Sequence, residues 1–435
     1  MQLSCLSVNH HNTPVELREC LNLPPEAIEE AFEAYPVRTG PFEPIAEMVV
    51  LSTCNRLEVY ALISTPENGS PDPTGSLLTY LAQVFRLPTG QVAPYILRYD
   101  GLTAADHLFR VAAGLDSIAV GETQVLGQVA RALELSLRLG SARHALSSLF
   151  RAAISAGKRV HTETAIGRRP VSISTVGIEL AESQYGSLAG ASILVVGAGK
   201  VGAETLNALR ARGAGAITLA NRTPGAAREM AVRYGARDIP YGRLADGLAG
   251  ADLVFSSTAA PSPILDRALL AEVMARRPGR SLVLVDLGVP RNVASDAREV
   301  PGVQLFDMDD IQAFTRQTGT TASPEVPLAE RIVAEEVAAY GKLLRVIPYI
   351  GELHKKVEQI RQHEVQKALR QLGNPTGEIA EQIDVFSRSL VRKILHEPTM
   401  HLRNESDQET LDEDVDALAR LFDLGEYNPE QALLA

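Results

Sequence analysis

A lone cysteine between two apolar runs is the residue of this chain best suited to nucleophilic chemistry. Cys54 lies within MVVLSTCNRLEVY (48–60) and is followed by Asn55 and Arg56. A thiolate attacks carbon, and a nearby guanidinium can favour ionisation of the thiol and bind a carboxylate through two parallel hydrogen bonds. On spacing alone, a buried apolar cysteine beside a solvated arginine is an equal alternative, because free cysteines are common in protein cores.

The segments around Cys54 predict a strand on each side, so that 52–56 forms the connection between them. Strands are predicted over 2–8, 46–51, 57–63 and 95–99, and helices over 25–34 and 77–85, with a Pro/Gly/Ser-rich loop over 66–75. This order is βαββαβ, the ferredoxin-like plan. From 104 to 185 the pattern turns helical.

A second motif with chemical meaning begins at residue 192. SILVV (192–196) predicts a buried strand, GAGKVG (197–202) is GxGxxG, and 203–212 predicts a helix. Such glycines let the backbone and the helix N-terminus approach a pyrophosphate. The next strand, 217–220, is followed by Asn221, Arg222 and Thr223, with an arginine near the place where an NAD enzyme usually has an acid, which favours NADP over NAD. The predicted cofactor contacts are Gly197, Ala198, Gly199, Lys200, Val201, Gly202, Asn221, Arg222 and Thr223. Strands at 252–257 and 282–287 continue a doubly wound parallel sheet.

After residue 310 the sequence becomes helical and rich in charge. One helix is predicted over 325–344 and another from Pro348, with an apolar stripe at Ile350, Leu353, Val357 and Ile360. Such a stripe suits helix pairing between subunits, and a monomeric bundle is the alternative. The tail from residue 404 is acidic and is expected to be mobile.

Composition predicts two or three domains, since the chain has 435 residues, 45% of them hydrophobic and 22% charged. A net charge of -11 argues against a nucleic-acid ligand, although a basic run exists at Lys158, Arg159, His161, Arg168 and Arg169. Three cysteines without a CxxC pair predict neither a disulfide framework nor a metal site. No apolar run is long enough to span a membrane, and the start MQLSCLSVNHH lacks the order of a signal peptide, so we expect a cytoplasmic protein.

The stretch STCNR (52–56), followed by EVY (58–60), resembles the signature of the glutamyl-tRNA reductase family. DHLF (106–109), GLDS (114–117) and GETQVLGQ (121–128) resemble a second signature of that family, and KILHEP (393–398) resembles a third segment. DLGVPR (286–291) is similar to the family's Asp-Leu-Ala-Val-Pro-Arg with glycine at 288. NHHNTP (9–14) resembles the family's Asn-His-Lys-Thr-Ala-Pro, and its departures at 11, 12 and 13 count against a specific role for this loop.

The resemblance implies NADPH-dependent reduction of glutamyl-tRNA(Glu) to glutamate-1-semialdehyde with release of tRNA, through a thioester on Cys54. This is the first step of five-carbon tetrapyrrole (porphyrin) biosynthesis. His107 would polarise or protonate the acyl oxygen or the leaving group. The implied substrate contacts are Thr53, Asn55, Arg56, Ser117, Glu122, Thr123, Gln124 and Gln128. Without the resemblance, Gln124 and Gln128 on one helical face indicate a polar helix surface. The implied partners are glutamyl-tRNA, a second copy of the chain and a glutamate-1-semialdehyde aminotransferase.

The resulting prediction is an α/β multidomain protein. It has a ferredoxin-like α+β catalytic domain over 1–160, a Rossmann NADP-binding domain over 170–312 and an all-α dimerisation domain over 325–435, with a hinge near 167–170. The alternative enzyme is a small-molecule NADP-dependent dehydrogenase of the shikimate-dehydrogenase type, which has a similar GxGxxG and Asn-Arg-Thr pattern and needs no cysteine nucleophile. A third class is a non-catalytic protein that binds NADP.

Overall fold

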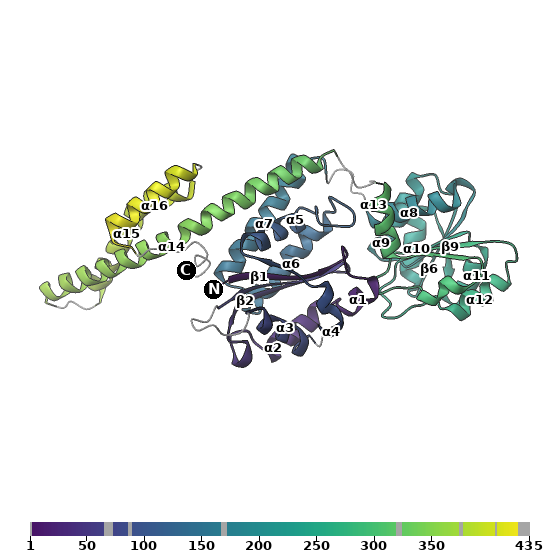
Figure 1. The fold of residues 1–435 in the computed structure, drawn as a ribbon, viewed down its shortest axis with the longest axis horizontal. Coiled ribbons are helices and arrows are strands. Elements are labelled where there is room, and N and C mark those ends of the chain that lie inside the picture. Colours follow the sequence, from purple (N-terminus) through teal and green to yellow (C-terminus); the bar gives the residue numbers. More distant parts are fainter. Residues whose placement is uncertain are drawn as a thin grey trace.

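The computed structural model describes residues 2–64, 73–85, 89–166, 172–318, 324–373, 377–404 and 407–424. Figure 1 shows an elongated molecule. An antiparallel sheet with its helices lies in the middle, a parallel sheet with its helices lies at one end, and a helical part lies at the other. The expected hinge at 167–170 falls outside the described residues.

The middle part has a four-stranded antiparallel sheet of order β2-β3-β1-β4, which confirms the ferredoxin-like prediction. Its strands are β1 (Gln2–Asn9), β2 (Ile45–Ser52), β3 (Arg56–Ile63) and β4 (Leu97–Asp100). Its first helices are α1 (Val15–Cys20), α2 (Pro25–Ala34), α3 (Pro73–Gln83) and α4 (Thr89–Val92). Most of the loop predicted over 66–75 lies outside the described residues.

The alternation of β3 sends apolar and polar side chains to opposite faces of this sheet. Leu57, Val59 and Ala61 pack with α2 and α3 in one core. Tyr60 faces the other core, formed with α5 (Leu102–Ala112), α6 (Gln124–Arg138) and α7 (His144–Glu163). By the same alternation Arg56 and Glu58 lie on the side of α5, so the strand after Cys54 carries a line of polar groups beneath a helix.

The second sheet has six parallel strands in the order β10-β9-β8-β5-β6-β7, the doubly wound arrangement that the sequence predicts. Its strands are β5 (Ser192–Val196), β6 (Ala216–Asn221), β7 (Arg237–Pro240), β8 (Leu253–Ser256), β9 (Leu282–Asp286) and β10 (Val303–Phe306). The helices are α8 (Ile173–Tyr185), α9 (Lys200–Ala211), α10 (Pro224–Tyr234), α11 (Leu244–Gly250), α12 (Arg267–Ala275) and α13 (Met308–Thr318). The carboxyl ends of the strands therefore present the loops at 197–202 and 286–293 along one edge.

The helical part contains α14 (Val326–Gln371), α15 (Glu378–Asn404) and α16 (Gln408–Phe422). The predicted break at Pro348 is wrong, because α14 runs through this position without interruption. Its first half packs against α5 and α7 through Ile332 and Tyr340, while Val346 and Ile350 pack with α16. Burial along both halves offsets the hydrogen bond that proline cannot donate.

The prediction of a mobile tail from residue 404 is wrong for 408–422, which form α16. The side chain of Asp407 caps this helix by accepting a hydrogen bond from the N–H of Thr410, and Leu411 and Val415 are buried against α14. Residues 425–435 lie outside the described part of the chain. No helix in that part is long and apolar enough to cross a membrane.

One face of α15 is apolar and open to solvent. Its exposed side chains are Ile379, Val385, Phe386, Leu390 and Ile394, and Phe386 is 69% exposed. Large apolar side chains gathered on one helix face mark a contact surface more often than a free one.

Candidate active site

Cys54 lies on the short turn between β2 and β3, as the sequence predicts. The hydroxyl of Thr53 accepts hydrogen bonds from the backbone N–H groups of Asn55 and Arg56, each at 3.2 Å. The N–H of Thr53 donates to the carbonyl of Arg56 at 2.9 Å. These bonds close the turn, and the side chain of Cys54 is exposed on it.

The environment of Cys54 opposes ionisation of the thiol. Cys54 keeps an exposed surface, yet protein atoms packed around its sulfur remove much of the surrounding water, and this desolvation, followed by the charge of Glu122, raises the pKa of Cys54 to about 11. Arg18 lowers it more than Arg56 does. Arg56 thus lowers the pKa of Cys54 as predicted, but burial and Glu122 outweigh both arginines. The thiol nevertheless reaches the surface, so a substrate can approach it.

Arg56 is buried, and its guanidinium is occupied within the protein. Its Nη1 donates to Glu58 Oε1 at 2.8 Å and to Asp116 Oδ2 at 2.9 Å, and Nη2 donates to the carbonyl of Asp116. The other carboxylate oxygen of Asp116 lies 2.8 Å from Nε2 of His11. Burial alone would raise the pKa of Asp116, but His11 and Arg56 outweigh it and hold this pKa below its usual value.

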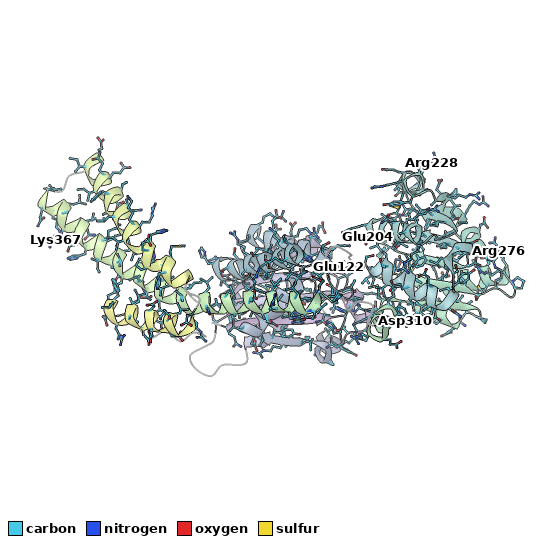
Figure 2. The ribbon with its side chains drawn as sticks, turned by 90° about the horizontal axis from the view of Figure 1, so that it is seen from above. Glu122, Glu204, Arg228, Arg276, Asp310 and Lys367 are labelled. Atoms are coloured by element: carbon cyan, nitrogen blue, oxygen red, sulfur yellow. The ribbon has the colours of Figure 1, made fainter. Side chains whose placement is uncertain are left out.

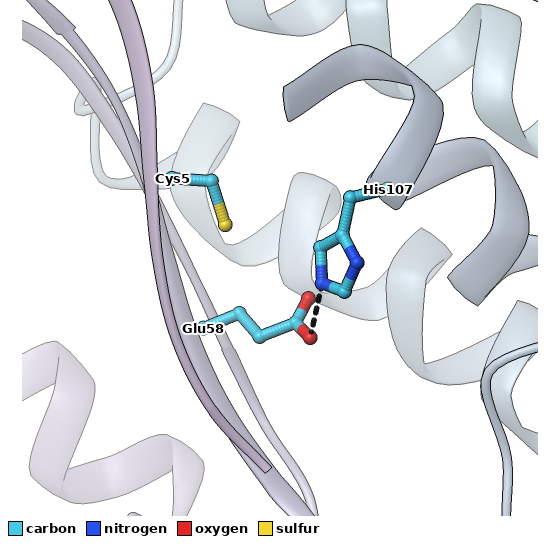
Figure 3. Close-up of side chains that lie close together, drawn as sticks. All are labelled: Cys5, Glu58 and His107. Carbon is cyan, nitrogen blue, oxygen red and sulfur yellow. Dashed lines mark hydrogen bonds and ion pairs between the residues drawn. The ribbon is translucent and has the colours of Figure 1, made fainter. Parts of the chain in front are cut away.

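Glu58 is fully buried and accepts four hydrogen bonds. Figure 3 shows its carboxylate beside His107, whose Nε2 lies 2.8 Å from Oε1. The same oxygen accepts from Arg56 and from Ser7 at 3.1 Å, and Oε2 accepts from Tyr60 at 2.7 Å. Burial opposes its charge, but His107 and then Arg56 lower the pKa of Glu58 to about 2. An ionised carboxylate can only accept, so Nε2 of His107 carries a proton.

His107 is held on two sides. Tyr99 stacks on its ring with 4.2 Å between centroids and 10° between planes. Ligand atoms of Cys5, Glu58 and His107 lie within 4.8 Å of one another, which is close enough to share a metal ion (Figure 3). Glu58 is already taken by its four donors, so we assign no metal to this group. No described contact joins His107 to Cys54.

The remaining predicted substrate residues lie on the segment that follows α5 and on the start of α6. Ser117 is 9% exposed, and its buried hydroxyl has no hydrogen-bond partner among the described residues. Glu122 is half-buried, and burial followed by the charge of Glu204 raises its pKa. Thr123 is exposed, and Gln128 is half-buried one turn beyond Gln124. Glu122 acts on the thiol of Cys54, and Ser117 directly follows Asp116, which holds Arg56.

A contact between the two sheets' domains brings this group to the dinucleotide motif. Nε2 of Gln124 donates to Oε1 of Glu204 at 3.1 Å, and Glu204 lies in the first part of α9, directly after the glycine motif. Figure 2 shows Glu122 and Glu204 next to each other where the two parts meet. Lys200, at the start of α9, also acts on the carboxylate of Glu122. The residues after the cysteine site and the helix that follows the glycine motif therefore lie against each other.

The three glycines of the motif differ in what surrounds them. Gly197 has φ +116 and lies against the carbonyl of Ser257, and a Cβ on Gly202 would come within 2.3 Å of the carbonyl of Gly197. A Cβ on Gly199 would meet nothing within 4 Å. A tight turn, an open approach and a close helix contact are the three roles that glycine has in dinucleotide loops. The hydroxyl of Ser257 is buried beside the loop without a described partner, so it is available to a ligand.

The other predicted cofactor residues follow β6. Oδ1 of Asn221 accepts from the N–H of Ala198 at 3.2 Å, and its amide donates to the carbonyl of Thr223. The side chain of Arg222 is exposed between them. Val201 packs partly buried against the apolar core beneath the sheet. This arrangement holds the glycine loop against β6 and leaves a guanidinium free to face a phosphate.

Asp286 braces the loop that follows β9. Its carboxylate accepts from Ser256 Oγ at 2.8 Å and from the N–H groups of Gly288, Asn292 and Val293. Burial raises the pKa of Asp286 to about 6 in spite of these donors. All of its described partners lie in this loop or on β8, so the structure gives it a bracing role.

Comparisons with known proteins agree over the whole chain. Residues 6–164 match the model "Glutamyl-tRNAGlu reductase, N-terminal domain", 179–314 match "Shikimate / quinate 5-dehydrogenase", and 328–424 match "Glutamyl-tRNAGlu reductase, dimerisation domain". The glutamyl-tRNA reductase of Synechococcus elongatus is 38% identical over 440 residues, with 98% of each chain covered. That of Chloroflexus aggregans is 36% identical over 438 residues, covering 98% of this chain and 95% of the relative.

The chain belongs to the glutamyl-tRNA reductase family. Among solved structures, a glutamyl-tRNA reductase from Methanopyrus kandleri is 29% identical with a TM-score of 0.43, covering 97% of this chain and 99% of that one. The dimerisation model spans α14 to α16 and so includes the open apolar face of α15.

The basic run at 158–169 is the densest candidate for a local basic surface, with a solvated helix end as the alternative. Arg159 is held by Glu163, Glu335 and Glu336, so its charge is compensated. Lys158 is exposed, whereas Arg168 and Arg169 lie outside the described residues. The described part of the run therefore offers less positive charge than the sequence suggests.

A cavity of about 250 Å³ lies away from both motifs. Ser192, Ala216 and Arg237, at the amino ends of β5, β6 and β7, line it together with α11. Ligands of doubly wound sheets bind at the carboxyl ends of the strands, so this cavity is not part of the dinucleotide site.

Sequence reasoning missed two residues of the site. Arg18 contacts Asn55 from a helix that the sequence does not clearly predict, and Asp116 holds Arg56 from 60 residues away. The signal that could identify Asp116 is its place directly before Ser117 in the GLDS segment, where an acid can pair with Arg56.

Proposed function

We propose that this chain reduces the acyl group of glutamyl-tRNA to glutamate-1-semialdehyde, with release of tRNA, through a thioester on Cys54. The contact between Gln124 and Glu204 carries the proposal, because it places the cysteine site against the helix that begins at the dinucleotide motif. A covalent acyl group on Cys54 would thus face the place from which a hydride must come.

In the first step, the sulfur of Cys54 attacks the ester carbonyl carbon, the bond from that carbon to the ribose oxygen breaks, and the oxygen leaves with a proton. With a pKa of about 11, the free thiol is almost entirely protonated at neutral pH, so its proton must be removed as the substrate binds. We propose Glu122, whose charge acts on the thiol, as the base that takes this proton.

In the second step, a hydride reaches the thioester carbonyl carbon, the carbon–sulfur bond breaks, and the sulfur leaves as a thiolate. A bound nicotinamide dinucleotide supplies this hydride. Gly199 leaves room for its pyrophosphate, and Arg222 would pair the 2′-phosphate of NADPH. We propose His107 as the group that polarises the acyl oxygen. Glu58 orients its ring, and no described contact links this ring to the thiol of Cys54.

Recognition of the glutamate side chain by Arg56 requires an exchange of partners. Arg56 is already paired with Oδ2 of Asp116. A substrate carboxylate would take the place of this oxygen, while His11 continues to hold Oδ1 of Asp116. Ser117, Glu122, Thr123, Gln124 and Gln128 remain proposed contacts for the rest of the glutamyl group, and the free hydroxyl of Ser117 supports its inclusion.

A single-turnover experiment tests the proposal. The protein is incubated with glutamyl-tRNA without NADPH, and the Cys54 peptide is examined by mass spectrometry for a glutamyl adduct. The Cys54→Ser variant is the matched control. We expect the adduct in the wild-type protein and its disappearance when NADPH is added. A protein that turns over without tRNA and forms no adduct would instead be a dehydrogenase of the type that matches residues 179–314.

The partners follow from the same proposal. A second copy of the chain would cover the apolar face of α15, in line with the matched dimerisation model. The aldehyde product is reactive, so an aminotransferase that consumes it remains a predicted partner, although no described surface identifies where it would dock.

A further inference from the structure

Arg18 is a buried arginine that links three segments of the chain. It lies on α1 and is 3% exposed. Its Nε donates to the carbonyl of Thr13 at 3.0 Å, Nη1 donates to Asn55 Oδ1 at 2.7 Å, and Nη2 donates to Asp309 Oδ1. Each guanidinium nitrogen is therefore committed to a different segment, which fixes the side chain in one geometry.

The first of these links reaches the cysteine turn. Asn55 follows Cys54 directly, and the turn is otherwise closed only through the Thr53 bonds described above. Arg18 holds the side chain of Asn55 from outside the turn, so it sets how the turn sits against α1. It is also the charged group that most lowers the pKa of Cys54, ahead of Arg56.

The second link reaches the nucleotide-binding domain. Asp309 lies at the start of α13, and its Oδ2 accepts from the N–H of Val15 at 3.0 Å while Oδ1 accepts from Arg18. The residue before α1 is Pro14, whose side chain makes no capping bond. A carboxylate from the other domain therefore caps α1 and anchors its arginine at the same time.

Another contact between the same helix and the same domain provides a comparison. Arg291, in the loop after β9, donates to Glu19 Oε1 at 2.8 Å and pairs with Glu16, both on α1. Arg291 thus docks α1 against the nucleotide-binding domain as Asp309 does. Its described bonds do not extend to the cysteine turn. A comparison of variants at Arg18 and Arg291 therefore distinguishes docking of α1 from an effect on Cys54.

We propose that Arg18 is a positioning residue for Cys54, and that Asp309 makes its position depend on how the nucleotide-binding domain is docked. Acyl transfer uses no cofactor, yet under this proposal its rate depends on Asp309, a residue of the nucleotide-binding domain. The inference rests on the proposed nucleophilic role of Cys54. A role in the domain interface alone is the competing explanation.

The test uses the full-length protein and two readouts on the Cys54 peptide. One is the rate of alkylation by iodoacetamide as a function of pH, and the other is the rate of glutamyl transfer without NADPH. For Arg18→Gln we expect alkylation at a fixed pH to slow about tenfold, since losing the nearest favourable charge raises the thiol pKa by roughly one unit. Glutamyl transfer should slow at least as much. For the matched control Arg291→Gln, both rates should stay within about twofold of wild type.

Asp309→Asn gives a result that a structural role alone would not. The charge of Arg18 is then no longer compensated, so alkylation should be no slower than in the wild type. Glutamyl transfer should fall about fivefold or more, a loss near 1 kcal/mol, because Arg18, and through it Asn55, is held less firmly. Should Arg18→Gln fail to fold, Arg18→Lys replaces it. Lysine keeps the charge but cannot donate to three segments at once, so the alkylation profile should stay near that of the wild type while transfer falls.

Equal slowing of both reactions in the Arg18 and Arg291 variants would overturn the proposal and leave Arg18 as an interface residue. If alkylation and glutamyl transfer slow by the same factor in Asp309→Asn, the proposal that Asp309 controls the position of Arg18 is also wrong. If the wild-type protein alkylates at Cys54 but forms no glutamyl adduct, the proposed function fails, and the alkylation profiles still decide whether Arg18 acts on the thiol.

Discussion

Replacing Glu58 with glutamine should destabilise the antiparallel sheet in a way that depends on pH. The pKa of Glu58 is about 2, against an ordinary value of 4.5, because His107 and Arg56 outweigh the cost of burial. At roughly 1.4 kcal/mol per pH unit, this difference corresponds to about 3 kcal/mol of folding free energy. The side chain is 0% exposed, so solvent does not screen the interaction.

The sign of the effect follows from the lowered pKa. A carboxylate that is ionised more easily in the folded state stabilises it above the unfolded pKa, and this contribution is lost as the pH falls from about 4.5 towards 2. The Gln variant lacks the contribution at every pH. The difference between wild type and Glu58→Gln should therefore be about 3 kcal/mol at pH 7 and should shrink steadily below pH 4.5.

Hydrogen exchange of the amides in β1 and β3 measures this difference locally, which avoids treating a chain of three parts as a two-state system. Tyr60→Phe is the matched control, because it removes a donor to Oε2 without removing the charge. We expect it to cost about 1 kcal/mol, with little change between pH 7 and pH 4. A Glu58→Gln deficit that is equally large at pH 7 and pH 3.5 would refute the electrostatic account and indicate a packing defect.

Five further substitutions test the site and the assembly. Cys54→Ser should slow reduction by on the order of a thousandfold or more while leaving NADPH binding, followed by fluorescence, close to that of wild type. Gly199→Ala should fold normally, since its Cβ meets nothing within 4 Å, yet weaken NADPH binding about tenfold or more, whereas Gly202→Ala should lower the melting temperature because its Cβ lies 2.3 Å from a carbonyl oxygen. Arg222→Ala should lower the preference for NADPH over NADH about tenfold, and an unchanged ratio of kcat/KM values would place the phosphate contact elsewhere. Phe386→Glu, at a position 69% exposed, should yield monomers in light scattering, and an unaltered mass would exclude this face from the dimer.

Both sheets could be predicted from the sequence because their signals are local. Alternating apolar residues mark the strands around Cys54, and a strand, three spaced glycines and a helix mark the dinucleotide fold. The elements without a clear prediction are short. β7 and β10 have four residues each and α1 has six, too few for a period to emerge above chance. The order of the strands then follows from the general rules of each fold.

Local signals mislead where tertiary packing decides the outcome. Proline at 348 predicts a helix boundary, yet α14 continues through it, because its two halves are buried against different partners. The acidic tail likewise forms α16, since Leu411 and Val415 have α14 to pack against. In both cases the information lies in residues far along the chain, and a window of neighbours does not contain it.

Distant contacts also decide which arginine is the main charge partner of Cys54. Arg56 stands two residues from Cys54 and so looks like its charge partner, but β3 turns it inward to Glu58 and Asp116, where its charge is used. Arg18 reaches the turn from 37 residues away and is anchored by Asp309, a further 291 residues along the chain. Cys54 lies on the turn between β2 and β3 and not on a strand, so the alternation of β3 does not place its side chain on the face of Arg56. Closeness in sequence therefore does not decide which charge acts most strongly on a cysteine in a turn, and its charge partner is better sought on the helix that packs against the turn.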